Sequence, residues 1–142
     1  MKEFFLPNPN TKELYRELVL WVYTSSEAFS LTYFREDEKE EYSPSVQEIR
    51  KQLEPALIHS ELTRDMPSMH VWGNHGLYEL ALYRAEMAQG FALSDAASSL
   101  WDWDYPNLPM DLCFFYKGVA WFVSSAHEHF AYISIERVLS NG

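Results

Sequence analysis

The chain has 142 residues, of which 47% are apolar and 16% are aromatic. This length and composition suit a single domain, residues 1–142, that can bury a sizeable core, and they exclude extensive disorder. The formal net charge of −10, from 21 acidic and 11 basic residues, disfavours direct nucleic-acid binding because phosphate backbones repel such a surface.

The first predicted elements are a helix and a strand. Residues 12–23 carry apolar side chains at helical spacing, and Asn10 and Glu13 are placed to cap this helix. Residues 28–34 alternate in the manner of a strand that has one buried face. The expected core-facing residues of the helix are Leu14, Leu18, Trp21 and Val22, with Tyr15 and Val19 widening the apolar stripe.

A second helix follows a charged connection at residues 35–45, which is expected to be solvated. Ser45 and Glu48 form a capping box at its start, and Pro55 ends or kinks it. Its expected core-facing residues are Val46, Ile49 and Leu53.

The middle of the chain carries weaker patterns. Residues 56–62 are compatible with a short strand, and residues 66–76 have the composition of a loop. Residues 77–85 predict a strand that places Tyr78, Leu80 and Leu82 on one face. Residues 86–103 predict one helix or two short ones, weakened by Gly90.

The C-terminal third predicts three antiparallel strands. Residues 111–116 and 119–125 flank Lys117-Gly118, which suits a tight hairpin turn, and residues 130–136 form the next strand. The order of elements predicts an α+β fold. We expect a mostly antiparallel sheet of about five strands ending in a three-stranded meander, with about three helices packed on it.

The compartment is also constrained by the sequence. The apolar run from Phe4 to Leu6 is too short for the core of a signal peptide, and no window approaches the ~20 apolar residues that span a bilayer. Cys113 is the only cysteine, which excludes an intrachain disulfide and is consistent with a reducing compartment. We therefore expect a cytoplasmic protein with no membrane association.

The tripeptide from His127 to His129 is the first candidate for chemistry. On a straight strand His127 and His129 would share a face and could bind zinc, with His70, His75 or Asp111 completing the site. The other interpretation, which we favour, is a polar hairpin bend, because two ligands alone are weak evidence for a metal. We expect no cofactor.

Two further constellations use neighbouring residues. Asp111 and Glu128, with His127, could act as general acid and base, but Asp111 is also well placed to cap the turn after Pro109. Cys113 with His127 could form a nucleophile and its base. A cysteine in this apolar strand is more typical of a small buried side chain.

Two tryptophans and two aspartates alternate at the end of the third helical segment. Exposed aromatics beside acids are typical of protein interfaces, whereas aromatics in general more often pack in the core. The candidate partner-binding residues are Trp101, Asp102, Trp103 and Asp104.

The same region resembles a family of small bacterial cytosolic proteins that has no known activity. The resemblance lies in the Trp101 to Trp103 motif, the segment from Leu108 to Phe114, Trp121 and His127-Glu128, within residues 77 to 133. Met110 stands where the family commonly has an acidic residue, and His129 is an additional histidine. The resemblance implies a bacterial cytosolic origin and an intact fold.

These features favour a non-catalytic, protein-binding domain similar to immunity proteins or antitoxins, whose acidic surface neutralises a basic partner. The alternative is a metal-dependent or hydrolase-like enzyme that uses Asp111, His127 and Glu128. A plainer possibility is an acidic domain, charged for solubility, that forms part of a larger assembly.

Overall fold

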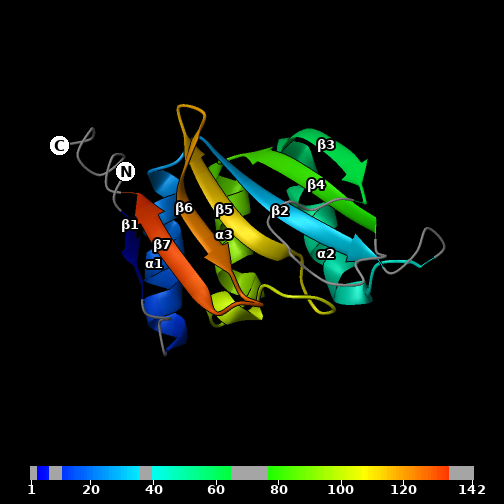
Figure 1. Ribbon diagram of the computed structural model, residues 1–142, viewed down its shortest axis with the longest axis horizontal. Helices are drawn as coiled ribbons and strands as arrows, with labels where there is room; N and C mark the ends of the chain where they lie inside the picture. Colours follow the sequence, from blue (N-terminus) through cyan, green and yellow to red (C-terminus); the bar gives the residue numbers. More distant parts are fainter. Residues whose placement is uncertain (1–2, 7–10, 36–39, 65–76, 135–142) are drawn as a thin grey trace.

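The computed structural model describes residues 3–6, 11–35, 40–64 and 77–134. They form a seven-stranded antiparallel sheet with three α-helices behind one face (Figure 1). The helices are α1 (Lys12–Thr24), α2 (Pro44–Leu53) and α3 (Met87–Ala96), with 3₁₀ turns η1 (Glu54–Ala56) and η2 (Leu100–Asp102). The strands are β1 (Glu3–Phe5), β2 (Ala28–Arg35), β3 (Leu57–Thr63), β4 (Leu77–Arg84), β5 (Met110–Tyr116), β6 (Val119–Ser125) and β7 (Phe130–Ser134).

The strands lie in the order β1-β7-β6-β5-β2-β4-β3, and each neighbouring pair is antiparallel. The α+β class and the closing β5–β6–β7 meander are therefore confirmed. The sheet has more strands than expected because residues 57–63 do form a strand, and because β1 is a three-residue strand paired with β7. So short a segment carries too little alternation to be recognised from the sequence.

Helix α1 buries one side of the expected apolar stripe, together with Tyr23, and leaves the other side exposed. Its buried residues are Tyr15, Val19, Val22 and Tyr23, whereas Leu14 and Trp21 are about half exposed. The apolar stripe is wide, so the sequence alone did not decide which side of it is buried. Thr11 caps this helix by accepting a hydrogen bond from the Leu14 N–H at 3.1 Å. The expected cap, Asn10, lies outside the described residues.

Helix α2 buries Val46, Ile49 and Leu53, as expected, but its start differs from the predicted capping box. The residue before the first turn is Ser43, and Pro44 occupies the first helical position, where its missing N–H is harmless. The Ser45 hydroxyl instead donates to the Asn107 carbonyl at 2.6 Å. This bond ties the helix to the loop before β5.

Strands β2 and β4 are neighbours in the sheet. Phe29, Leu31 and Tyr33 of β2 are all buried, which confirms the predicted alternation. On β4 the helix-facing residues are Glu79, Ala81 and Tyr83. Strand alternation then places the predicted set of Tyr78, Leu80 and Leu82 on the opposite face. Against that second face, Tyr78 and Met110 form a smaller buried cluster with Phe34, Leu80 and Tyr105 packed around it.

Helix α3 crosses α1 at Gly90. A β-carbon at this position would lie 2.8 Å from the Tyr23 ring, so glycine is required for the close approach. The Tyr23 hydroxyl also donates to the Glu86 carbonyl at the start of α3. Gly90 weakens the helix in isolation but permits its packing.

The β5–β6 turn is formed by Lys117 and Gly118, both with positive φ, at 51° and 78°. This confirms the predicted hairpin. Among the described residues, none of the helices is long and apolar enough to cross a membrane.

Candidate functional site

The His127–His129 tripeptide forms the turn between β6 and β7. The His129 N–H donates to the Ala126 carbonyl at 3.2 Å, and the three side chains are exposed. His129 has φ of 57° and stacks on Trp101, with ring centroids 5.6 Å apart and 15° between the ring planes. The backbone therefore forms a polar hairpin bend. In addition, the His129 side chain is held by its contact with Trp101.

Within the parts of the chain that the structure describes, no group of three or more His, Cys, Asp or Glu side chains is arranged to hold a metal ion. His127 and His129 are neighbours in the turn, and Asp111 lies near His127. The other predicted ligands, His70 and His75, lie outside the described residues.

Asp111, Asp104 and Glu128 are brought together at this end of the sheet. Burial, together with the negative charges of Asp104 and Glu128, raises the pKa of Asp111 to about 6, and His127 acts in the opposite direction. Asp111 also has a φ of 58°, which aspartate tolerates better than most residues. The predicted proximity of Asp111, His127 and Glu128 is thus present, in a region of concentrated negative charge.

Cys113 lies in β5, opposite Ser30 of β2 and Val123 of β6. Burial raises the pKa of its thiol to about 11, so at neutral pH it is protonated. A nucleophilic cysteine needs a lowered pKa. The structure therefore favours the packing role for Cys113.

Of the four predicted partner-binding residues, Trp103 is buried and the other three are at least partly exposed. Trp103 is 0% exposed, and its indole N–H donates to the Tyr15 hydroxyl at 2.7 Å, so it belongs to the core. Asp102 caps η2 by accepting the N–H groups of Ser98 and Ser99. Trp101 is partly exposed.

Asp104 is partly exposed and accepts the N–H of Tyr105 at 2.9 Å. This bond helps to fix the start of the 104–109 segment, which leads into β5. Asp104 therefore lies between the acidic residues Asp111 and Glu128 on one side and Tyr105, which lines a pocket described below, on the other.

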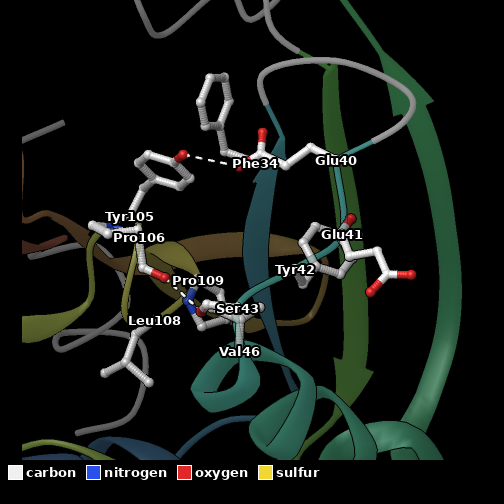
Figure 2. Close-up of a pocket in the computed structure, with 10 residues that line it drawn as sticks. All are labelled: Phe34, Glu40, Glu41, Tyr42, Ser43, Val46, Tyr105, Pro106, Leu108 and Pro109. Atoms are coloured by element: carbon white, nitrogen blue, oxygen red, sulfur yellow. Dashed lines mark hydrogen bonds between the residues drawn. The ribbon is translucent and has the colours of Figure 1, made fainter.

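An open pocket of about 100 Å³ lies between the 104–109 segment and the start of α2 (Figure 2). The Tyr105 hydroxyl donates to the Glu40 carboxylate at 3.1 Å, and the Ser43 hydroxyl donates to the Pro106 carbonyl at 2.7 Å. The carboxylate of Glu41 is exposed and is turned away from Tyr105. The lining residues, mostly apolar or acidic, are Phe34, Glu40, Glu41, Tyr42, Ser43, Val46, Tyr105, Pro106, Leu108 and Pro109.

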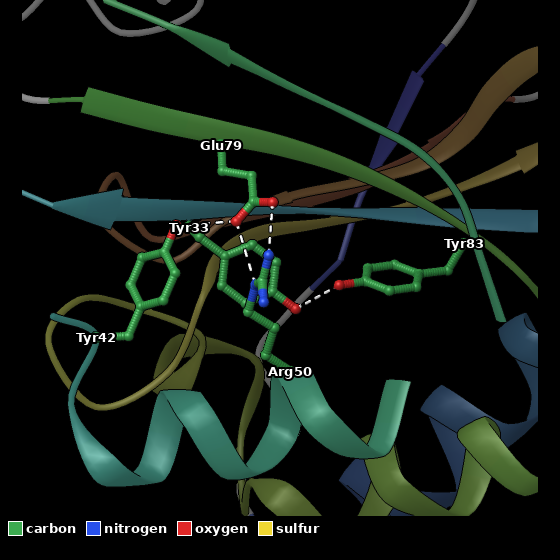
Figure 3. A network of polar contacts seen from close by, with 5 residues as sticks. All are labelled: Tyr33, Tyr42, Arg50, Glu79 and Tyr83. Atoms are coloured by element: carbon green, nitrogen blue, oxygen red, sulfur yellow. Dashed lines mark hydrogen bonds and ion pairs between the residues drawn. The ribbon is translucent and has the colours of Figure 1, made fainter. Parts of the chain in front are cut away.

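A polar network lies between α2 and the sheet (Figure 3). Arg50 donates to both carboxylate oxygens of Glu79, at 3.2 and 2.9 Å, and the Tyr42 hydroxyl donates to the same carboxylate at 2.9 Å. Beside them the hydroxyls of Tyr33 and Tyr83 are 2.5 Å apart. The Arg50 guanidinium also lies over the Tyr33 and Tyr42 rings.

The network holds Glu79 ionised although its side chain is nearly buried. Burial acts to raise the pKa of Glu79, but the hydrogen bonds from Arg50 and Tyr42 and the charge of Arg50 outweigh it, so the pKa is lowered. The same bond to Glu79 raises the pKa of Arg50. A small cavity of about 50 Å³ beside the pair is lined by both residues, yet their polar atoms are already engaged. The arrangement serves to fix α2 on the sheet.

Neither the pocket nor the network was predicted from the sequence. Glu79 could have been noticed as the only charged residue of β4 before its last residue, Arg84, which suggests a buried partner. Its partner Arg50 lies 29 residues away in the chain, and no local pattern links them. The pocket likewise joins residues about 65 positions apart, Glu40 and Tyr105.

Comparisons with protein-family models, with curated proteins and with solved structures each find no match. The resemblance of residues 77–133 to a small bacterial family therefore stays a prediction.

Proposed function

We propose that the protein is a small, non-catalytic cytoplasmic domain that binds a basic protein partner, in the manner of an immunity protein or antitoxin. The observation that carries this proposal is the pocket beside the 104–109 segment, whose apolar walls reach the Glu40 carboxylate. A lysine side chain has the matching build, since it buries an apolar stem and presents a cation at its end.

The size of the pocket supports this choice of ligand. An enclosed cavity of ~150 Å³ holds benzene, so a pocket of about 100 Å³ has room for the end of a lysine side chain. Its aromatic walls, Phe34 and Tyr105, meet edge to face with centroids 4.9 Å apart. Aromatic rings attract cations that approach their faces.

The charge of the surroundings supports the same partner. The net charge of −10 draws a basic protein toward this surface, and Asp104, Asp111 and Glu128 concentrate negative charge near the same segment. Trp101 and Asp102, of the partner-binding residues proposed from the sequence, lie just before that segment. Trp103 contributes by holding the segment to the core rather than by touching the partner.

A titration followed by NMR tests the pocket directly. The methylamide of N-acetyl-lysine is expected to shift the resonances of Ser43 and Tyr105, whereas the corresponding norleucine compound, which lacks the charge, shifts them less. Glu40→Gln, which keeps a hydrogen-bond acceptor for Tyr105, should reduce the lysine effect several-fold. The matched control is Glu17→Gln, on the exposed side of α1, which should leave it unchanged. Equal shifts with both compounds would remove the basis for a cation site.

A second candidate function is the metal-dependent or hydrolase-like enzyme, and the pKa of Asp111, raised to about 6, favours it. A carboxyl group with such a pKa can donate and accept protons near neutral pH. Metal analysis of purified protein separates the two proposals. Stoichiometric zinc that disappears in His127→Ala would favour the enzyme, and its absence in the wild type would leave the binding domain.

A further inference from the structure

Strand β3 forms one end of the sheet. It pairs with β4 on one side, and on its other side no described strand pairs with it (Figure 1). The strand is seven residues long and contains neither proline nor lysine, two residues that commonly protect such edges, and it has one irregularity, between Leu57 and His59. Its outer N–H and C=O groups can therefore accept a further strand.

The side chains of β3 are unusually apolar for an exposed edge. Ile58 is 50% exposed and Leu62 is 60% exposed, and Leu57 is also exposed. Single exposed apolar residues are common, but here they recur along a strand that has a neighbour on one side only in the described part of the sheet. This pattern is typical of an edge that is covered by another chain.

The sequence of β3, LIHSELT, is complementary to itself when read in the opposite direction. In an antiparallel pair centred on Ser60, Ile58 of one copy lies opposite Leu62 of the other. In the same pair His59 lies opposite Glu61. By two-fold symmetry each contact occurs twice. Cross-strand apolar pairs stabilise such pairing, and a histidine opposite a glutamate adds to it when the histidine is protonated.

The register of β3 on β4 is regular from His59 to Thr63 and shifts between Leu57 and His59, at Ile58. Ser60 pairs with Ala81 and Leu62 pairs with Glu79, and both partners face the helices. His59 and Glu61 point to the opposite face, where their side chains already lie 3.8 Å apart within one chain. Leu62 and the His59–Glu61 contacts would thus lie on separate faces of the joined sheet.

We propose that two copies of this chain associate through antiparallel pairing of β3 with β3, centred on Ser60, to form one continuous sheet. This inference does not depend on the proposed function, because the pocket lies at the start of α2 and away from β3. The net charge of −10 on each copy opposes the association. Added salt screens that repulsion, so the dimer should become stronger as ionic strength rises.

Sedimentation equilibrium of the full chain over a range of concentrations tests the proposal. The wild type should approach the mass of two chains as concentration and salt increase. Ile58→Lys should abolish this increase, because it places a charge in the apolar contact of both copies. Val119→Lys is the matched control, since Val119 is also 50% exposed but lies at the β5–β6 turn, and it should dimerise like the wild type.

Charge exchange tests the register. His59→Glu sets two pairs of carboxylates against one another and should raise the dissociation constant about tenfold, since the change acts twice by symmetry. The double variant His59→Glu/Glu61→Lys restores opposite charges and should recover wild-type association. A protein that stays monomeric at all concentrations, a dimer unaffected by Ile58→Lys, or a double variant no tighter than His59→Glu would each overturn the proposal.

Discussion

Asp111→Asn is expected to stabilise the protein at neutral pH. The aspartate carboxylate is partly buried near Asp104 and Glu128, and its pKa in the folded protein is about 6 instead of 3.8. Asparagine has nearly the same shape, carries no charge and is well suited to the positive φ of 58° at this position. The substitution therefore removes the electrostatic penalty with little change in packing.

The magnitude and sign follow from proton linkage. Between the unfolded pKa of 3.8 and the folded pKa of about 6, the native state binds more protons, so the stability of the wild type falls as pH rises. Well above pH 6 the ionised Asp111 lowers the free energy of unfolding of the wild type by about 3 kcal/mol. At pH 4 it lowers it by only about 0.5 kcal/mol. Asp111→Asn should therefore gain about 2 to 3 kcal/mol at pH 8 and little at pH 4.

Urea unfolding at pH 4, 6 and 8 measures this difference. The control is Asp95→Asn on α3, where an exposed ion pair with Arg16 contributes little at any of these pH values. A gain that did not depend on pH, or a loss of stability at pH 8, would refute the electrostatic account of Asp111.

Two further substitutions probe the interior. Glu79→Gln should cost about 2 to 4 kcal/mol at pH 7, because it breaks a nearly buried ion pair with Arg50. Since the folded pKa of Glu79 is lowered, this stabilisation is lost as pH falls below the ordinary glutamate value, so the two proteins should converge in urea unfolding at acid pH. Trp103→Phe should cost about 1 to 3 kcal/mol beyond Trp101→Phe in thermal unfolding, because it removes the buried bond to Tyr15. Equal losses in the two tryptophan variants would contradict a core role for Trp103.

The elements with strong alternation or clear turn chemistry were predictable from the sequence. Strand β2, the Lys117-Gly118 hairpin and the buried stripe of α2 depend on local patterns and local φ preferences. The orientation of α1 was not predictable, because Leu14 and Trp21 widen the apolar stripe beyond its buried side. Tertiary packing decides which side of such a stripe is buried.

The candidate site was predictable only in part. The proximity of Asp111 to His127 and Glu128 followed from the hairpin meander that brings the ends of β5 and β6 together. The burial of Trp103 did not, because its partner Tyr15 lies 88 residues away on α1. Contacts between distant segments leave no signature in a single sequence.

The proposed function is tested most directly by affinity capture of the protein's partner from a lysate of its source organism, followed by elution with increasing salt. We predict that the wild type retains a basic protein that elutes as salt rises, because its contacts with Glu40 and the surrounding acids are screened. Glu40→Gln should release the same protein at lower salt, while Glu17→Gln behaves like the wild type. Retention of no basic protein, or of one that neither salt nor Glu40→Gln affects, would contradict the proposed binding function.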